Sequence, residues 1–446
     1  MNVYVLDING SPLMPTTPSR ARRMLRDGKA KVESRTPFTV KLLYEPEAHE
    51  VQPVSLGVKP SYDNVKLSAT TESEEVYMST VLLRTDIPNK IETRRSLRRT
   101  RRNRLRYRPA RWQNRAIPKG WFPPSTRQKL DAYIKAIENV KKILPVSNII
   151  VEIGSYDIRK LIDKNIAGEE YQKPIINAPE LLSEEELEEI DDWNIREYVM
   201  ARDKFKCRCC KGKSGDKVLG VHHLKDYIHT DKPDPKKHYS VQNTITVCNS
   251  CHEKIHSGEL ECKAKNRGFK AEAFANSTKY ELIRMLQAKY PDQIKFTFGY
   301  ITKSRRIKNN VSAEDQGHTF AIAGNFNAKR ADEFFLQKKI RCHDRSIFDQ
   351  QAKKGGVYRR RQSPQFMNGF KMYDKVIYDG NECFVTGRDR KGYVVLNNLD
   401  KTIKYHACAR MDKVKIVERG TCAPIERRTL EKQHEINKMI EEKKKK

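Results

Sequence analysis

The chain has 446 residues, a length that suggests about two to four domains. Its 88 Lys and Arg residues against 57 Asp and Glu residues give a formal net charge of +31, which favours a polyanionic partner. Nucleic acid is the leading candidate for this partner, and a membrane surface is the alternative. No apolar run reaches the roughly 20 residues that span a bilayer, which excludes a membrane-spanning protein. Ten cysteines in a cytosolic chain suit metal sites better than disulfides.

The N-terminal region predicts strands with one basic helix. MNVYVLDINGSPLMP is typical of a short strand followed by a turn, and residues 19–27 are typical of the helix. The same stretch lacks the charged start and the small-residue cleavage site of a signal peptide, so we expect a cytosolic protein.

A run of arginines follows at residues 94–115, where 11 of 22 residues are arginine. No Gly or Pro interrupts residues 94–107, so the pattern predicts a helix that Pro109 ends. The arginines cover nearly every face of this helix, so it cannot bury one side in an ordinary core, and guanidinium forks on a rigid rod suit phosphate contacts. We expect nucleic-acid contacts from Arg94, Arg95, Arg98, Arg99, Arg101, Arg102, Arg104, Arg106, Arg108 and Arg111.

Two cysteine pairs lie further along, after an acidic stretch (ELLSEEELEEIDDW, within 166–195) that we interpret as a solvated helical linker. The pairs are Cys207-x2-Cys210 and Cys248-x2-Cys251. Four thiolates with this spacing can form a tetrahedral Zn²⁺ site that holds a small domain together, so we expect structural zinc. Cys209 lies between two of the ligands and is interpreted as a bystander.

Histidines lie between and beside these cysteines. His222 and His223 occur in GVHHLKD, Asn243 ends SVQN, and His252 and His256 occur in CHEKIH. Two strands followed by a helix would bring them together, with His252 and His256 on one helix face. Neighbouring residues of a strand point to opposite sides, so His222 and His223 cannot have the same role.

The C-terminal part predicts a small β-domain and a helix. MYDKVIYDGNECFVTG alternates apolar and polar residues around an Asp-Gly turn. A basic segment that contains Arg359, Arg360 and Arg361 precedes it and suits RNA contacts, while residues 424–446 predict a charged helix that ends in KKKK.

The order and spacing of the histidines resemble those of HNH nucleases. The resemblance implies that His223 is the general base and that Asn243 braces the loop and orients it. It also implies that His222 and His252, with His256 as a further candidate, hold a catalytic Mg²⁺ or similar divalent cation.

The rest of the chain resembles the IscB family of transposon-encoded, RNA-guided nucleases, which is similar to the ancestor of CRISPR type II effectors. MNVYVLDINGSPLMPTTPSRARRMLRDGKAKV resembles the PLMP region that opens this family, and the arginine run resembles its bridge helix. NIIVEIGSYDI and DQGHTFAIAG resemble the second and third RuvC motifs. RCHDRSIFDQQAKKGGVYRRRQ and NGFKMYDKVIYDGNECFVTG resemble the part that contacts guide RNA and the target-adjacent motif.

The resemblance implies an α+β multidomain protein in which a split ribonuclease-H-like (RuvC) fold carries an inserted ββα-metal HNH domain. It also implies a structured guide RNA, double-stranded target DNA, no membrane, one chain with one RNA, and a place in the prokaryotic cytosol or nucleoid. The expected segments are the PLMP region (1–52), three RuvC-like pieces (53–90, 117–195 with the linker, 263–345), the bridge helix (91–116), the HNH domain (196–262) and the C-terminal domain with its basic tail (346–446).

The RuvC-like motifs depart from the family pattern. Lys59 replaces the first aspartate and His318 replaces the last, while Glu152 remains. A lysine adds positive charge where two Mg²⁺ ions need negative charge, and substitution by Asp63 or Asp315 is the alternative that would preserve a metal site. The flanking segments SLGVK, NIIVEI and TFAIA remain apolar and are expected as strands, so we predict an inactive, scaffolding RuvC-like domain.

The leading hypothesis is therefore an RNA-guided nickase whose HNH site cuts the guide-paired strand. The lost carboxylates leave open an RNA-guided DNA-binding protein that does not cut. The histidines leave open an HNH endonuclease of the homing type that acts without RNA.

Overall fold

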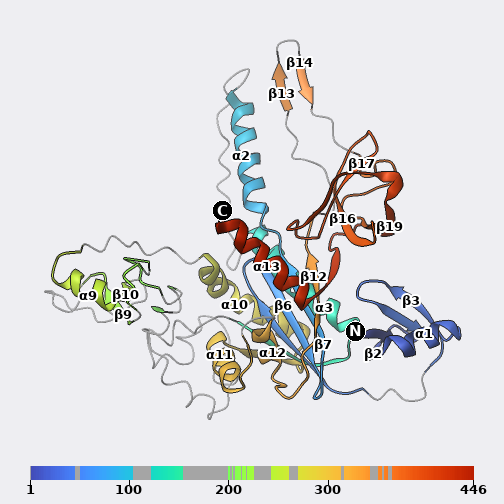
Figure 1. Ribbon diagram of the computed structural model, residues 1–446, viewed down its shortest axis with the longest axis horizontal. Coiled ribbons are helices and arrows are strands. Elements are labelled where there is room, and N and C mark those ends of the chain that lie inside the picture. The colour runs from blue at the N-terminus through green and yellow to red at the C-terminus, as the bar shows by residue number, and fades with distance from the viewer. Residues whose placement is uncertain are drawn as a thin grey trace. The chain divides into compact units, whose positions relative to one another are not determined.

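The computed structural model of the chain is mixed α and β, with several separate sheets (Figure 1). It describes residues 2–45, 51–103, 122–153, 199–200, 203, 206–211, 213–216, 218–225, 243–260, 270–312, 316–341, 350–353, 356–359 and 364–445. These fall into two compact units. The first unit contains residues 1–151, 292–294 and 309–446, and the second contains residues 152–291 and 295–308.

The first unit begins with a four-stranded sheet in the order β2-β1-β4-β3. The elements are β1 (Val3–Leu6), β2 (Pro12–Thr16), α1 (Pro18–Arg26), β3 (Ala30–Ser34) and β4 (Thr39–Leu42). Ala21 of α1 packs with Val3, Val5 and Val40 of the sheet, and the remaining faces of the helix carry exposed arginines. The apolar positions thus explain how so basic a helix folds onto the sheet.

The largest of the described sheets has seven strands in the order β11-β8-β5-β6-β7-β12-β20 and is called the central sheet here. Its strands are β5 (Val54–Pro60), β6 (Asn64–Thr70), β7 (Glu75–Leu82), β8 (Val146–Glu152), β11 (Ile294–Thr297), β12 (Glu333–Lys338) and β20 (Ile425–Thr429). Strands β5, β6 and β7 form an antiparallel meander, β8 runs parallel to β5, and β12 runs parallel to β7. The sheet therefore joins strands from widely separated parts of the chain.

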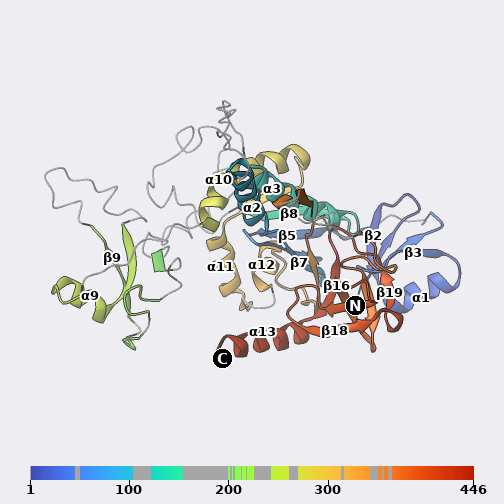
Figure 2. The ribbon, with the colours of Figure 1, turned by 90° about the horizontal axis from the view of Figure 1, so that it is seen from above.

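Two helices pack on opposite faces of the central sheet (Figure 2). Helix α3 (Pro124–Lys141) is fixed at the β5–β6 hairpin, where the Lys129 ammonium donates to the Tyr62 carbonyl at 2.7 Å and the Tyr133 hydroxyl donates to the Ser61 carbonyl at 3.1 Å. Helix α12 (Gly317–Ala323) packs on the other face over Gly57. A side chain at Gly57 would place its Cβ 2.5 Å from the Thr319 carbonyl, so only glycine permits this close approach.

The expectation that TFAIA is a strand is wrong, because residues 319–323 belong to α12. Every residue of this helix except His318 is buried. A short apolar run that is buried on all sides fits a core helix as well as a core strand, so its residues alone do not distinguish the two.

The C-terminal sheet has five strands in the order β18-β17-β16-β15-β19. They are β15 (Lys375–Tyr378), β16 (Asn381–Arg388), β17 (Tyr393–Asn397), β18 (Lys404–Arg410) and β19 (Lys415–Glu418), with a 3₁₀ turn η2 at Met411–Lys413. Asp379 and Gly380 have φ values of 49° and 71°, the left-handed pair that a two-residue hairpin turn needs. Strands β13 (Gln350–Lys353) and β14 (Gly356–Arg359) pair as a separate hairpin.

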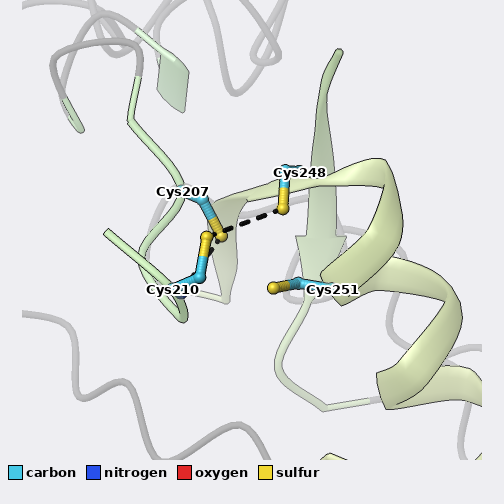
Figure 3. Close-up of side chains that lie close together, drawn as sticks. All are labelled: Cys207, Cys210, Cys248 and Cys251. Atoms are coloured by element: carbon cyan, nitrogen blue, oxygen red, sulfur yellow. Dashed lines mark hydrogen bonds between the residues drawn. The ribbon is translucent and has the colours of Figure 1, made fainter. Parts of the chain in front are cut away.

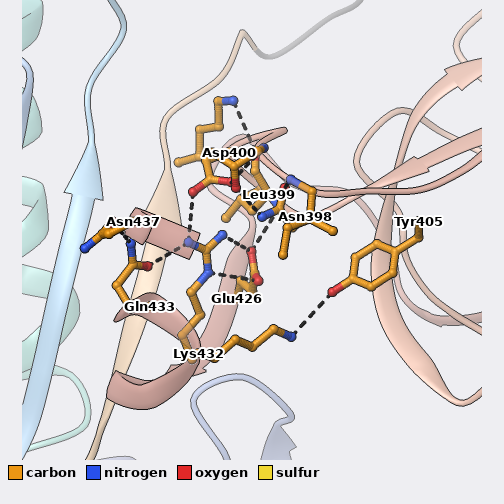
Figure 4. A network of polar contacts seen from close by, with 12 residues as sticks. Asn398, Leu399, Asp400, Tyr405, Glu426, Lys432, Gln433 and Asn437 are labelled. Atoms are coloured by element: carbon orange, nitrogen blue, oxygen red, sulfur yellow. Dashed lines mark hydrogen bonds and ion pairs between the residues drawn. The ribbon is translucent and has the colours of Figure 1, made fainter. Parts of the chain in front are cut away.

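The expected helix at residues 424–446 begins later than predicted. Residues 425–429 are strand β20, which pairs antiparallel with β12, and helix α13 covers Leu430–Lys445. Arg428 explains the difference, because its side chain is only 1% exposed and donates to both Glu426 and Asp400 at 2.8–2.9 Å. Figure 4 labels these two carboxylates in the network of polar contacts. Arg428 also donates to Gln433 of α13 at 2.9 Å, so a charged segment is held in the sheet by buried ion pairs.

Replacing Arg428 by methionine should destabilise the first unit by about 3–5 kcal/mol, because Glu426 and Asp400 would lose their buried counter-charge. The free energy of unfolding, measured by denaturant titration, tests this. Arg427→Met is the matched control, since Arg427 pairs with Glu333 on the half-exposed side of the same strand and should cost at most about 1 kcal/mol. Equal losses in the two variants would contradict the assignment of Arg428.

The other helices among the described residues are α2 (Ile87–Asn103) in the first unit, and α9 (Asn249–His256), α10 (Lys270–Lys289) and α11 (Gly299–Lys308) in the second. The second unit also contains a two-stranded antiparallel sheet of β9 (Leu219–His223) and β10 (Thr244–Cys248). Helix α9 follows β10 directly and packs against both strands.

Candidate metal centres of the second unit

Four cysteines form a cluster beside β10, here called the cysteine cluster: Cys207, Cys210, Cys248 and Cys251. Their sulfur atoms lie within 4.8 Å of one another and face a common centre (Figure 3). The Cys210 and Cys248 sulfurs are 3.7 Å apart, close to the separation of about 3.8 Å that tetrahedral Zn–S bonds of about 2.3 Å require. The cluster could therefore hold zinc. Cys209 is not one of its members.

The electrostatics of the cysteine cluster favour a bound cation. Burial, followed by hydrogen bonds with the three neighbouring thiols, raises the pKa of the Cys251 thiol. Burial also raises the pKa of Cys207. Four thiolates this close repel one another unless a divalent ion compensates their charge, which is what a structural zinc ion does.

Three histidines form a second cluster, here called the histidine cluster: His222, His252 and His256. His222 lies in β9, opposite Ile245 of β10, and the other two lie one turn apart in α9. The ring of His222 is 5.3 Å from each of the other two rings, and the Nε2 atoms of His252 and His256 are 3.2 Å apart. One nitrogen from each ring lies within 4.8 Å of the others, so the three can share one metal ion.

Two imidazoles of the histidine cluster, those of His222 and His252, are held in the neutral form. Burial, followed by the nearby His252, His256 and His223, lowers the pKa of His222 to about 4. Burial and His256 also lower the pKa of His252. At neutral pH these rings therefore offer nitrogen lone pairs, and a metal does not first have to displace a proton from them.

His223 lies outside the histidine cluster. It is the next residue of β9 and pairs with Thr244, so strand alternation directs it away from the face that His222 shares with α9. Asn243 fixes the chain just beyond it: the side-chain oxygen accepts from the Lys225 amide at 2.9 Å, and the side-chain nitrogen donates to the Lys225 carbonyl at 2.7 Å. The Asn243 carbonyl accepts from the Leu224 amide at 2.7 Å.

The two clusters are mechanically linked through α9. Cys248 immediately precedes this helix and Cys251 lies in its first turn, so a metal in the cysteine cluster would fix the helix that carries His252 and His256. Asp216 adds a cap that we did not predict, because its carboxylate accepts from the amide and the hydroxyl of Ser250. The bond from the Ser250 amide is the main reason why the pKa of Asp216 is lowered. The Gly-Asp turn signal in SGDKV was the available sequence clue.

Mg²⁺ does not fit the histidine cluster well. This ion prefers oxygen ligands in octahedral geometry, whereas the three donors are imidazole nitrogens. Among the described residues, no carboxylate belongs to the group. The donor set instead suits first-row transition metals.

The three positions that the sequence resemblance assigns to a degenerate RuvC-like site lie on three separate elements. Lys59 is near the end of β5, Glu152 is the last residue of β8, and His318 is in α12. Lys59 pairs across the strands with Lys66, whose pKa is lowered by burial and then by the charge of Lys59. Within the described part of the chain, none of these residues belongs to a group of three or more metal-ligating side chains. Asp315 lies outside the described residues.

The arginine run is described only in part. Arg94, Arg95, Arg98 and Arg99 are exposed on α2, and Arg102 is half-buried. Arg95 approaches Glu92 at 3.9 Å. The helix begins at Ile87, before the predicted run. The backbone of Arg101 belongs to this helix, its side chain is not described, and residues 104–121 with the remaining arginines lie outside the described residues. The exposed guanidinium groups therefore remain available to solvent and ligand along this helix.

Comparison with known protein families matches the N-terminal part of the chain. Residues 3–174 match the family described as RRXRR protein, a domain found in IscB-like and Cas9-like HNH endonucleases and associated with nuclease activity. The matched region ends before the cysteine and histidine clusters begin. No curated protein matches the chain. None of the described helices is both long and apolar enough to cross a membrane.

Proposed function

We propose that the protein is an RNA-guided DNA endonuclease of the IscB kind that nicks the guide-paired strand at its HNH-like centre. The observation that carries the proposal is the convergence of three histidines on one side of β9, with His223 on the other. The match of residues 3–174 to a domain of HNH endonucleases supports the same reading from a separate part of the chain.

The chemistry assigned to the centre is hydrolysis of a phosphodiester. His223 takes a proton from the attacking water, and Asn243 holds the strand end so that the imidazole keeps its direction. His222, His252 and His256 would hold a divalent cation, which would supply positive charge at the scissile phosphate and the leaving oxygen. Because His222 and His223 face opposite sides of β9, ligand and base do not compete for the same space.

The RuvC-like domain is proposed to be a ribonuclease-H-like scaffold without activity. Support comes from the central sheet, in which β5–β7, β8 and β12 derive from the three predicted RuvC-like segments. Lys59 replaces a negative charge by a positive one, and each unit-charge interaction at metal-ligand distance is worth about 4 kcal/mol at an effective dielectric constant of about 20. Two divalent cations would not tolerate this change.

Nucleic acid is the proposed partner of the first unit. The exposed arginines of α2 and the net charge of +31 support binding of a structured guide RNA and of the target heteroduplex. In this proposal one chain binds one RNA, the guide selects the site by base pairing, and the C-terminal domain reads the short flanking motif.

Guide dependence tests the proposal. The protein, purified with the RNA encoded beside its gene, should nick a supercoiled plasmid that carries the matching target and leave a mismatched plasmid intact. Nicking that survives ribonuclease treatment during assembly would replace the proposal by an RNA-independent HNH endonuclease. Guided binding without any nick would replace it by a DNA-binding protein.

A further inference from the structure

We propose that the histidine cluster binds a divalent transition-metal ion of the Mn²⁺-to-Zn²⁺ series in preference to Mg²⁺. The inference rests on the proposed function for the role of the site, but the metal preference follows from the donors themselves. All three are imidazole nitrogens, and affinity for such nitrogen donors rises along the series toward copper.

The spacing of the donors fits the short bonds of these metals. Metal–nitrogen bonds of about 2.0–2.1 Å place two neighbouring ligand nitrogens about 2.8–3.4 Å apart, with octahedral geometry at the short end and tetrahedral geometry at the long end. The Nε2 atoms of His252 and His256 lie 3.2 Å apart, within that range. The nitrogen of His222 lies within 4.8 Å of both, so a modest ring rotation completes the set.

Three protein ligands distinguish this centre from the cysteine cluster. A structural zinc site is closed by four protein ligands, whereas a catalytic site has three and keeps a position for water or substrate. His256 is exposed and the other two histidines are half-buried, so the centre opens to solvent. Three neutral ligands also leave the full double positive charge of the ion available to an anionic phosphate.

The second unit should therefore hold two metal ions of different kinds. The cysteine cluster offers four sulfurs, which select zinc, while the histidine cluster offers three nitrogens. Because the clusters have different donors, Co²⁺ bound at each gives a different visible spectrum, and the two sites can be followed separately in one protein.

The test is Co²⁺ titration of the full protein–RNA complex with zinc in the cysteine cluster, in buffer with millimolar Mg²⁺. We expect one equivalent of Co²⁺ with a nitrogen-donor spectrum that Mg²⁺ does not displace. His252→Ala should weaken this binding by at least about 100-fold and leave the zinc content unchanged. His223→Ala is the matched control and should bind Co²⁺ normally, because His223 lies on the opposite side of β9.

A second variant tests the donor argument directly. His222→Asp replaces one nitrogen by oxygen and should reduce the preference for Co²⁺ over Mg²⁺. Displacement of Co²⁺ by millimolar Mg²⁺ in the unaltered protein, or unchanged Co²⁺ binding in His252→Ala, would overturn the inference. Guided nicking with Mg²⁺ alone would contradict the metal preference and leave the proposed function standing. Co²⁺ binding without nicking under any metal would contradict the proposed function and leave the metal preference standing.

Discussion

Replacing His223 by alanine should lower the rate of guided nicking by about 10²- to 10⁴-fold and leave target binding unchanged. The variant loses the group proposed to accept the proton of the attacking water. It keeps the histidine cluster and the arginines of α2. Single-turnover nicking of a guided plasmid, with a gel-shift measurement of target binding, gives both quantities.

His238→Ala is the control for this prediction, because His238 has no assigned role. It should nick at the normal rate. The nicking rate of Asn243→Ala should lie between those of His238→Ala and His223→Ala. This variant removes the hydrogen bonds to the Lys225 backbone and leaves the imidazole of His223 in place. Normal nicking by His223→Ala would show that another group is the base.

Replacing Cys251 by serine should abolish the structural zinc and unfold the β9–β10–α9 region, while the first unit stays folded. Structural zinc contributes on the order of 10–16 kcal/mol in small metal-dependent domains, more than a sheet of two strands and one short helix can supply by packing. The buried core there is small, with Ile245 and Val247 as its aliphatic members. Zinc content per chain and hydrogen exchange at the β10 amides measure the two effects.

Cys209→Ser provides the matched control, since Cys209 lies between two ligands in sequence and outside the cysteine cluster. It should retain its zinc and its protected amides. Loss of zinc from Cys209→Ser, or full zinc in Cys251→Ser, would mean that the ligands are assigned wrongly. Nicking should follow zinc content in both variants, because the cysteine cluster fixes the helix that carries two of the histidines.

The two clusters of the second unit could be predicted because their signals are local. The Cys-x2-Cys pairs have the spacing of a zinc site, and His252 and His256 are four residues apart on one helix face. To place His222 beside these two histidines, we also had to infer that its strand lies next to this helix. The preference for Mg²⁺ came from resemblance rather than from donors, and the all-nitrogen donor set argues against it.

Features that depend on distant partners could not be predicted. Strand β20 looked like the start of a helix because Arg428 finds Asp400, 28 residues earlier in the chain, only in the folded sheet. Helix α12 looked like a strand because the short, largely apolar run TFAIA does not reveal that it covers Gly57. In both cases tertiary contacts decided between local conformations that the residues alone left open.

Strand-resolved cleavage tests the central claim most directly. A supercoiled plasmid with the matching target and a randomised flank is given to the protein–RNA complex with a divalent metal, and each strand is sequenced at the break. We predict nicked circles that are cut only in the guide-paired strand, because the proposed function assigns cleavage to the HNH-like centre alone and treats the RuvC-like site as inactivated by Lys59. Linear product with both strands cut, or a break only in the unpaired strand, would contradict the account.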